Sequence, residues 1–276
     1  MPEGPECKIV GEYLHNKLKN ANCVAMIFHK NSRYIKHSLP LRFSELTYPF
    51  KILSVNVKGK LIWFEFDNGL YMLNTLGMSG MWTQTKKKHC DFEIIYTKSE
   101  VKENAKCENI FFKDMRHFGT IKFVNLDELN NKLRTIGRDV IEEEISLEEF
   151  KDLLYKRKNW TLPKFLMNQR YLSGIGNYLK SEILYLSKIS PFRNISNLDN
   201  DEIKILLRNI MEIPPKSYRH QGVSIIDYTP PENYREQLDE FKLHVYGRKT
   251  DDNDYKIIRI QTSDKRTTHY VPEIQK

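Results

Sequence analysis

The chain has 276 residues, 40% of them hydrophobic, which suits one large or two ordinary domains and excludes a disordered chain. No run reaches the roughly 18 apolar residues of a membrane span, and the start lacks a secretory-signal pattern, so we expect a soluble intracellular protein of the cytoplasm or nucleus, not a secreted one. The 44 Lys and Arg against 36 Asp and Glu give a net charge of +8, which favours nucleic acid as a partner but also fits a solvated basic surface.

The first half of the sequence predicts a β-sandwich preceded by a helix. Apolar residues recur at near-helical spacing over residues 5–18. Strands are predicted by runs rich in β-branched and aromatic residues, at 22–29, 52–57, 61–66, 70–76, 91–97 and 120–124. The turn signal Asp67-Asn68-Gly69 makes a hairpin of the third and fourth runs.

The second half predicts helices, beginning after a change of texture near Gly137-Arg138-Asp139. Helical patterns cover 146–156, 162–168, 176–188 and 199–211, with Ser146 as an N-cap and Pro214-Pro215 ending the last. Residues 213–236 are predicted to form a loop, and strands at 255–262 and 266–271 flank the turn Ser263-Asp264-Lys265. We therefore expect an α+β fold with domains 1–136 and 137–276, the latter ending in a β-hairpin at about 245–276.

Ordinary side chains must supply the chemistry. The four cysteines, Cys7, Cys23, Cys90 and Cys107, form no Cys-x-x-Cys pair, so the pattern predicts neither a zinc site nor a disulfide framework. The sequence also lacks a His-Glu-x-x-His segment, a Walker-type loop and a Gly-x-Gly-x-x-Gly motif after a strand, which excludes the commonest metalloprotease, nucleotide and dinucleotide sites. We expect no cofactor and no metal.

The chain begins Met-Pro-Glu-Gly-Pro-Glu, and methionine is normally removed when the second residue is small. Removal leaves Pro2 with an α-amine, a group whose ordinary pKa of about 8 keeps part of it unprotonated at neutral pH. Such an amine can attack an electrophilic sugar carbon and form an iminium Schiff base. The neighbouring Glu3 could protonate the sugar oxygen and open the ring. Taken alone, this start also fits an ordinary terminus.

A second candidate is the segment Gly174-Ile175-Gly176-Asn177, between two predicted helices. The glycines permit a tight turn with positive φ, and the next helix then points free backbone amides outward as an anion site. Asn177 adds a side-chain donor there. Taken alone, the segment also fits an ordinary connection between helices.

Three motifs occur in the same order as in a known family: the N-terminal Met-Pro-Glu-Gly-Pro-Glu, Lys60 in Val57-Lys58-Gly59-Lys60, and Gly174-Ile175-Gly176-Asn177. With them the chain resembles the formamidopyrimidine-DNA glycosylase and endonuclease VIII family over nearly its whole length. Further matches to the family are Leu76-Gly77-Met78-Ser79-Gly80, Arg116-His117-Phe118-Gly119, Gly137-Arg138-Asp139 and Val245-Tyr246-Gly247-Arg248.

The resemblance implies an N-terminal helix plus β-sandwich, then a helical domain with a helix-two-turns-helix motif, with DNA in the cleft between them. It implies that Pro2 is the Schiff-base nucleophile and Glu3 the general acid. Lys60 would be a cation near the lesion sugar and its phosphate, and Asn177 would hold a backbone phosphate. Without the resemblance, Lys60 would be an ordinary turn lysine.

The family extrudes the damaged nucleotide from the duplex and fills the hole with three side chains. Met78, Arg116 and Phe118 stand at the matching positions, as wedge, donor to the orphaned base and stacking ring. Read alone, Met78 and Phe118 would be core residues and Arg116 a surface charge. His89 and Lys158 fall near DNA-contact positions but fit a solvated basic stretch equally well. Glu6 would contact the flipped nucleotide, or it would cap the first helix.

The C-terminus departs from the family pattern. Most members end in a four-cysteine zinc finger whose hairpin places an arginine against DNA, but this chain has no cysteine after Gly247. The predicted hairpin resembles the zincless finger of certain endonuclease VIII-like proteins, which implies that Arg266 grips the phosphate at the lesion. If the hairpin register differs, Lys265 or Arg259 would take this role.

The expected function is that of a bifunctional DNA glycosylase and lyase of base excision repair, acting as a monomer on damaged DNA and its flipped-out oxidised nucleotide. We expect excision of oxidised pyrimidines and of ring-opened or hydantoin lesions, with strand cleavage by β,δ-elimination. The alternatives are a non-catalytic damaged-DNA-binding protein and an RNA-binding module. The presence of both Pro2 and Glu3 favours the enzyme over the first, and the motifs of the first half disfavour the second.

Overall fold

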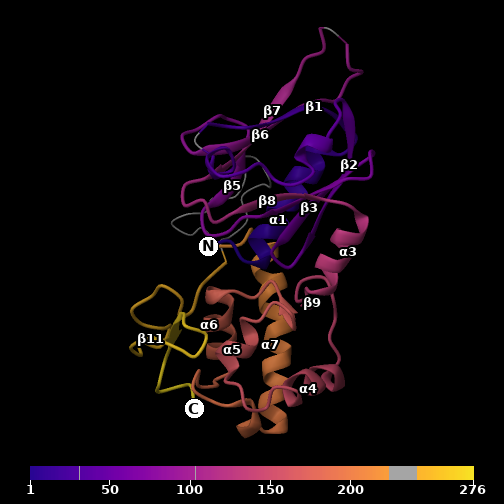
Figure 1. Cartoon of the computed structure of the whole chain (residues 1–276). Helices are drawn as coiled ribbons and strands as arrows, with labels where there is room; N and C mark the ends of the chain where they lie inside the picture. Colours follow the sequence, from indigo (N-terminus) through magenta and orange to yellow (C-terminus); the bar gives the residue numbers. More distant parts are fainter. Residues whose placement is uncertain (31, 103, 224–240) are drawn as a thin grey trace. The chain divides into compact units, whose positions relative to one another are not determined.

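The computed structural model describes the chain except residues 31, 103 and 224–240 (Figure 1). It divides into two compact units. The first, here called the sheet unit, contains Met1–Pro2, Glu6–Arg134 and the segment that begins at Val223. The second, here called the helical unit, contains Glu3–Pro5, Thr135–Gly222 and the segment that ends at Lys276.

The sheet unit is built on eight strands that form one hydrogen-bonded sheet in the order β5-β7-β6-β1-β2-β3-β4-β8. The strands are β1 (Ala21–Phe28), β2 (Phe50–Lys58), β3 (Leu61–Phe66), β4 (Tyr71–Thr75), β5 (Gly80–Thr83), β6 (Cys90–Thr97), β7 (Glu108–Asp114) and β8 (Thr120–Val124). The helices are α1 (Gly4–Leu18), whose first residues belong to the helical unit, α2 (Arg33–Lys36) and α3 (Leu126–Arg134), with a 3₁₀ turn at Phe43–Glu45.

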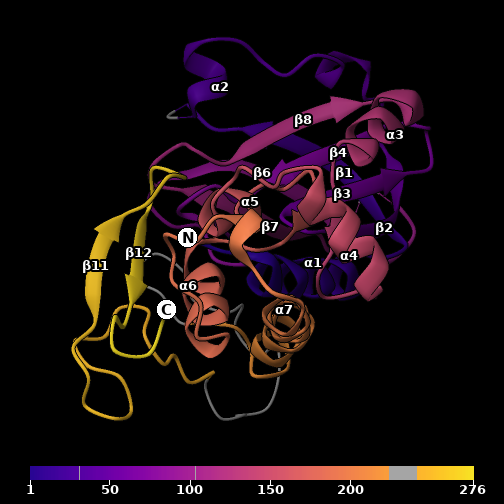
Figure 2. The ribbon, with the colours of Figure 1, turned by 90° about the horizontal axis from the view of Figure 1, so that it is seen from below.

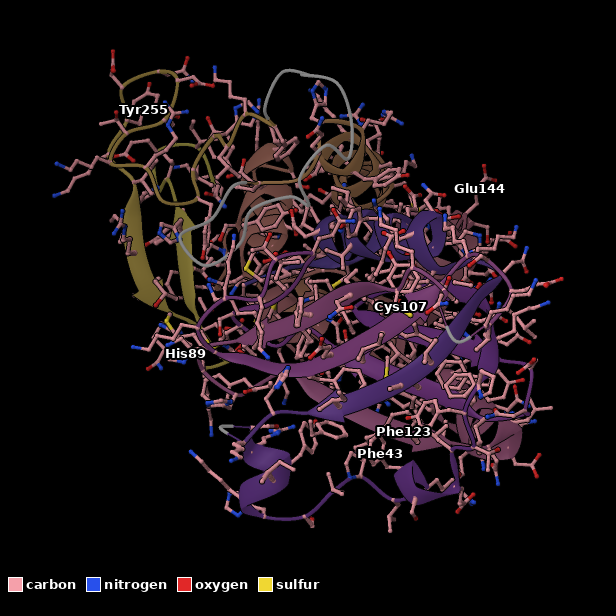
Figure 3. The ribbon with its side chains drawn as sticks, turned by 90° about the horizontal axis from the view of Figure 1, so that it is seen from above. Phe43, His89, Cys107, Phe123, Glu144 and Tyr255 are labelled. Atoms are coloured by element: carbon pink, nitrogen blue, oxygen red, sulfur yellow. The ribbon has the colours of Figure 1, made fainter. Side chains whose placement is uncertain are left out.

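This sheet folds over on itself into a sandwich. Phe64 on β3 and Trp82 on β5 are distant in strand order, yet their ring centroids lie 5.6 Å apart. The indole of Trp82 also donates to Asn74 Oδ1 on β4 at 3.0 Å. Phe123 belongs to the core, and the half-buried ring of Phe43 packs against it with the two centroids 5.4 Å apart; both are labelled in Figure 3. The apolar face of α1 joins the same core, so the predicted helix plus β-sandwich is confirmed.

Two strands of this sheet were not predicted from the sequence. β5 has only four residues, and its Trp82 stands between a glycine-rich turn and a polar run. β7 has polar residues at both ends, and only Ile110, Phe111 and Phe112 are buried apolar residues within it. β5 pairs with β7, and β7 pairs with β6 on its other side, which are long-range interactions that a local pattern does not reveal.

The helical unit contains α4 (Leu147–Tyr155), α5 (Leu162–Leu166), α6 (Asn177–Leu186) and α7 (Asn200–Arg219), with a 3₁₀ turn at Ile195–Asn197. The predicted N-cap is confirmed, because Ser146 Oγ accepts from Glu149 N, and the Glu149 carboxylate accepts from Ser146 N to complete a capping box. A short parallel pair, β9 (Arg138–Asp139) and β10 (Leu172–Ser173), precedes α6. Among the described residues no helix is long and apolar enough to cross a membrane.

Helix α7 continues through Pro214 and Pro215, so the prediction that they end this helix was wrong. Each proline removes a backbone donor and costs about 3 kcal/mol in a helix interior. Burial on this turn outweighs the cost: Ile213 and Pro214 are buried, and Ser217 Oγ lies 3.0 Å from the hydroxyl of Tyr178 on α6. Residues 213–219 are therefore helical rather than loop, and residues 224–236 of the predicted loop lie outside the described residues.

The predicted C-terminal hairpin is confirmed. Its strands are β11 (Ile258–Gln261) and β12 (Thr267–Tyr270), paired antiparallel from Ile258 with Tyr270 to Gln261 with Thr267. The turn Ser263-Asp264-Lys265 lies between them, with Lys265 at φ +60°. Figure 2 shows the hairpin beside α6, and β12 is the strand that contacts this helix.

Candidate active site

The carboxylate of Glu3 occupies the N-terminus of α6. Glu3 is 2% exposed, and its oxygens accept from three backbone amides, those of Gly176 at 2.7 Å, Tyr178 at 2.8 Å and Leu179 at 3.2 Å. A helix N-terminus favours a negative charge because its first amides have no partner within the helix. The Gly174-Ile175-Gly176-Asn177 segment predicted an anion site here, and the carboxylate of Glu3 occupies it.

The glycines of the motif make room for this contact. A Cβ on Gly176 would lie 2.2 Å from Cδ of Glu3, and a Cβ on Gly4 would lie 2.8 Å from Cα of Gly174. Gly174 itself has φ +100°, which favours glycine, and its carbonyl accepts from Gly4 N at 2.8 Å. The start of the chain and this turn are therefore fitted to each other, and Pro2 is attached directly to the fixed residue.

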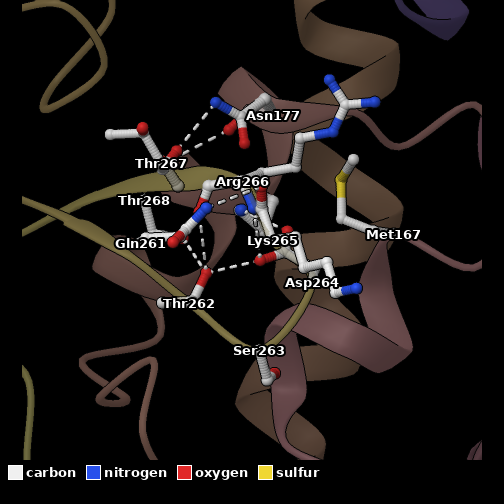
Figure 4. A network of polar contacts seen from close by, with 12 residues as sticks. Met167, Asn177, Gln261, Thr262, Ser263, Asp264, Lys265, Arg266, Thr267 and Thr268 are labelled. Carbon is white, nitrogen blue, oxygen red and sulfur yellow. Dashed lines mark hydrogen bonds and ion pairs between the residues drawn. The ribbon is translucent and has the colours of Figure 1, made fainter.

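Asn177, the first residue of α6, contacts the hairpin. Its Nδ2 donates to the carbonyl of Thr267 at 2.8 Å, next to Arg266 in the chain (Figure 4). Its Oδ1 is buried and has no hydrogen-bond partner among the described residues. Arg266 is exposed, whereas the guanidinium of Arg259 donates to the carbonyl of Gly247 at 3.1 Å. Asn177 and Arg266 thus lie close together in the helical unit.

Met78, Arg116 and Phe118 lie in two adjacent loops of the sheet unit. Nη1 of Arg116 is 3.6 Å from Sδ of Met78, and Phe118 is 59% exposed. These are the three residues predicted to fill the hole left by a flipped base. The structure brings two of them into contact and exposes the third. Phe118 is therefore not the core residue that its local sequence alone would predict.

Asp114, which the sequence analysis missed, holds this arrangement. It is 1% exposed. One carboxylate oxygen accepts from Ser79 Oγ at 2.6 Å and from Arg116 N at 3.2 Å, and the other accepts from Gly119 N at 2.6 Å. Asp114 therefore joins the loop that carries Met78 to the loop that carries Arg116. The signal was its place two residues before the Arg116-His117-Phe118-Gly119 motif.

A second carboxylate that the sequence did not predict, Asp91, contacts the loop that carries Arg116 and Phe118. Its Oδ2 is 2.7 Å from Nδ1 of His117, which has φ +55°. Burial raises the pKa of Asp91, an effect that the hydrogen bond and charge of His117 oppose. The guanidinium of Arg33 donates to the carbonyl of His117 at 2.9 Å. The predicted DNA-contact residue His89 is linked to this region by its backbone: its carbonyl accepts from Asp114 N at 3.0 Å.

The remaining predicted residues are more dispersed. Pro2 is buried, and Lys60 is half-buried in the turn between β2 and β3, after Gly59 at φ +56°. Glu6 is 0% exposed and its Oε1 accepts from Val223 N at 2.9 Å. The described part of the chain thus shows Glu6 bonded to backbone that leads into residues 224–240.

Lys158 is exposed in the connection between α4 and α5. It borders a hollow of about 610 Å³ that Arg157, Trp160, Arg170 and Tyr171 also line. Nε of Arg157 donates to the hydroxyl of Tyr171 at 2.6 Å, and its guanidinium lies 5.5 Å from the centroid of the Trp160 ring. Lys158 therefore lies in a basic and aromatic surface.

Among the described residues no group of three or more His, Cys, Asp or Glu could hold a metal ion.

Comparison with known proteins identifies the class. The family model of the formamidopyrimidine-DNA glycosylase N-terminal domain matches residues 1–121, and that of its H2TH domain matches residues 136–228. The Fpg protein of Thermus thermophilus superposes with a TM-score of 0.82 at 24% identity, covering 99% of this chain and 98% of its own. The Lactococcus lactis Fpg, solved with DNA containing an abasic site, superposes with a TM-score of 0.84 at 23% identity, covering 99% of each chain. These structures confirm the α+β fold.

Curated relatives identify the family. The formamidopyrimidine-DNA glycosylase of Rickettsia felis is 30% identical over 256 residues, which is 90% of this chain and 88% of the relative. The relative of the same name from Arabidopsis thaliana is 26% identical and covers 100% of this chain and 71% of its own. The chain belongs to the formamidopyrimidine-DNA glycosylase family. The predicted family and enzyme class, a DNA glycosylase, are thereby confirmed.

Proposed function

We propose that the chain is a bifunctional DNA glycosylase and abasic-site lyase of base excision repair, with the N-terminal amine of Pro2 as its nucleophile after removal of Met1. The observation that carries this proposal is the anchoring of Glu3 by three backbone amides at the N-terminus of α6, those of Gly176, Tyr178 and Leu179. These hydrogen bonds fix Glu3, and Pro2 is bonded directly to it, so the position of the Pro2 amine is restricted. An α-amine needs little pKa tuning to act as a nucleophile near neutral pH.

The reaction begins when the amine attacks C1′ of the damaged nucleotide and the base leaves with its bonding electrons and a proton. Glu3 assists opening of the sugar ring, and its carboxylate stabilises the cationic iminium that follows. Elimination of the 3′ phosphate and then the 5′ phosphate cleaves the strand. Water finally releases the sugar fragment and restores the amine.

Met78, Arg116 and Phe118 fill the space that the flipped nucleotide leaves. The contact between Arg116 and Met78 and the 59% exposure of Phe118 support this role, because the first two side chains already lie together and the exposed ring is free to stack on a base. Flipping costs a few kcal/mol of lost stacking and pairing. A ring that stacks and a guanidinium that donates to the orphaned base offset part of that cost.

Cations and amides hold the DNA backbone in this proposal. Lys60 and Arg266 contact the phosphates at the lesion, and Asn177 contacts another with the second hydrogen of its Nδ2. His89 and Lys158 contribute further contacts, and Glu6 contacts the flipped nucleotide. Phosphate contacts position the enzyme on any sequence, whereas the lesion itself is selected by the pocket.

Oxidised pyrimidines and ring-opened or hydantoin lesions are the proposed substrates. The name that the curated relatives share refers to a ring-opened base, and one solved relative, from Lactococcus lactis, was crystallised with DNA containing Fapy-dG. Both support the ring-opened class. Oxidised pyrimidines are proposed from the hairpin without cysteines, which resembles endonuclease VIII-like proteins.

Base release and strand cleavage on a panel of duplexes with single defined lesions test the function. We expect excision of ring-opened purines, hydantoins and oxidised pyrimidines, with phosphate at both ends of the gap, as β,δ-elimination requires. Tight, selective binding to damaged DNA with no excision by a chain that begins at Pro2 would favour the non-catalytic alternative. N-terminal mass analysis must precede that conclusion, because a retained Met1 blocks the amine.

A further inference from the structure

A buried ion pair joins the middle of α6 to the turn of the hairpin. Nζ of Lys180 lies 2.6 Å from Oδ2 of Asp264, and the two side chains are 0% and 4% exposed. Removing two charges from water is costly, and the mutual attraction offsets this only with good geometry and further hydrogen bonds. Neither residue has a part in the proposed chemistry, so the pair calls for another explanation.

The carboxylate of Asp264 also organises the turn. Its second oxygen, Oδ1, accepts from Thr262 Oγ1 at 2.5 Å and from the backbone amide of Arg266 at 3.4 Å (Figure 4). The amide of Thr262 in turn donates to the carbonyl of Arg266 at 3.0 Å. One buried carboxylate thus links Lys180 of the helix to the backbone of Arg266.

Two neighbours of Lys180 on α6 reinforce the link. Nδ2 of Asn177 donates to the carbonyl of Thr267 at 2.8 Å, and Oγ of Ser181 accepts from His269 N at 3.3 Å. Asn177, Lys180 and Ser181 are spaced three and four residues apart, so they share one face of the helix. That face contacts the hairpin at its turn and along β12.

The shifts in the pKa values of Lys180 and Asp264 are consistent with a charged pair. Burial lowers the pKa of Lys180, and the carboxylates of Asp264 and Glu3 oppose that effect. Burial acts to raise the pKa of Asp264, but the hydrogen bonds from Lys180 and Thr262 outweigh it and hold this pKa below its ordinary value. Asp264 is therefore an anion at neutral pH.

We propose that Lys180 and Asp264 are positioning residues, whose buried pair fixes the hairpin turn on α6 and thereby sets where the guanidinium of Arg266 is presented to DNA. This inference rests on the role of Arg266 in the proposed function. Two strands of four residues are marginal by themselves, so the hairpin needs an anchor. Because the N-terminus of α6 also holds Glu3, one helix fixes both Glu3 and Arg266.

The test is the double variant Lys180→Met/Asp264→Leu, which removes both charges and leaves no buried charge unpaired. We expect a melting temperature within a few degrees of the native protein. Single-turnover cleavage of abasic-site DNA at saturating enzyme should fall about tenfold or more, with affinity for DNA changed less than about threefold. Lys204→Met, which breaks an exposed helical pair with Asp201, is the control and should change none of these.

An Arg266→Ala background separates positioning from mere stabilisation. There the double variant should cause less than about a twofold further loss, because a misplaced arginine and a missing arginine are equivalent. Two results overturn the inference. One is a native cleavage rate in the double variant. The other is a triple variant whose fold-loss equals the product of the losses of the double variant and of Arg266→Ala. If the double variant does not fold, Thr262→Val, which removes one contact of Asp264 without burying a charge, answers the same two questions.

The role of Arg266 and the positioning role of Lys180 and Asp264 can be tested separately. If Arg266→Ala alone cleaves normally, the proposed role of Arg266 is wrong. If Arg266→Ala is impaired while the Lys180 and Asp264 variants cleave normally, only the positioning role is wrong.

Discussion

The carboxylate of Glu3 binds amides that lie up to 176 residues away in the sequence. Both of its oxygens accept from backbone donors, and Gly176 leaves the space that its side chain needs. Charge-assisted hydrogen bonds of this kind are shorter and about twice as strong as neutral ones. At the scale of the residue, the site is therefore a fixed carboxylate beside Pro2.

Glu3→Gln should abolish base removal while leaving DNA affinity nearly native. General acid catalysis contributes on the order of 100-fold to 10,000-fold, whereas the group adds little to ground-state binding. The amide would also turn an NH₂ group toward at least one backbone donor, at a cost of about 1–3 kcal/mol in stability. Excision and binding assays on one lesion check this. Cleavage of a preformed abasic site should survive in part, and undiminished excision would assign the acid to another group.

Arg266→Ala should weaken activity on all lesions alike, because a phosphate contact carries no base information. A guanidinium can give a phosphate two charge-assisted hydrogen bonds that alanine cannot replace. The salt dependence of DNA binding should lose roughly one unit of slope. Lys249→Ala, an exposed charge in the same unit, should do much less. If Lys265→Ala or Arg259→Ala is crippled instead, the arginine has been assigned wrongly.

At the scale of the element, α6 is the helix around which the C-terminal segment is organised. Besides the contacts of Asn177, Lys180 and Ser181, the buried carboxylate of Glu182 accepts from the amides of His244, Val245 and Tyr246. The hydroxyl of Tyr185 donates to Asp251 at 2.9 Å. Polar side chains of one helix thus hold a segment whose own strands are short.

Acid should loosen the hairpin through His269. This residue is 7% exposed on β12, and burial, followed by the charges of Arg259 and Lys180, lowers its pKa to about 4. Because the folded pKa lies below the unfolded value of about 6.5, the unfolded state binds more protons between these values. Stability from this group is complete above about pH 6.5 and is lost as the pH falls towards 4, by up to about 3 kcal/mol.

Melting temperatures of the native protein and of His269→Phe at pH 7 and pH 4.5 measure this effect. Phenylalanine keeps a ring against Tyr246 but cannot titrate. The variant should lose less stability on acidification, whereas His37→Gln, an exposed histidine, should behave as the native protein does. An unchanged acid response in His269→Phe would rule out the histidine as its source.

At the scale of the whole molecule, local patterns predicted most of the fold. The strands rich in β-branched and aromatic residues, the N-cap at Ser146 and the hairpin turn before Arg266 all depend on neighbours in sequence, which a pattern can represent. The turn of α7 that contains Pro214 is buried, and Ser217 on it contacts the hydroxyl of Tyr178 on α6, which no local pattern contains. Tertiary contacts outweighed backbone propensity there.

The candidate site divides in the same way. Pro2, Glu3 and Asn177 were found because their motifs match a family. Asp114 and Lys180 were missed because their importance lies in partners 35 and 84 residues away. A motif lies close to Asp114 in the sequence, but the loop that such a carboxylate or lysine holds is not part of any local pattern, so the structure is needed to reveal it.

Metal analysis tests how the hairpin is held. We expect no stoichiometric zinc in the purified protein and no loss of excision with chelators, because no cysteine follows Cys107 and structural zinc sites usually need thiolates. A relative with a four-cysteine finger, treated alongside, gives the positive control. One zinc per chain, lost together with activity, would refute this prediction.

Borohydride trapping tests whether the Pro2 amine is the nucleophile. Reduction during reaction with lesion-containing DNA should convert the iminium into a stable covalent adduct, whereas direct displacement by water leaves none. Peptide mapping of a protein that begins at Pro2 should place the adduct on the Pro2 nitrogen, with no adduct on the same protein carrying a retained Met1. An adduct on an internal lysine such as Lys60, or none at all from a protein that excises the base, would contradict the account.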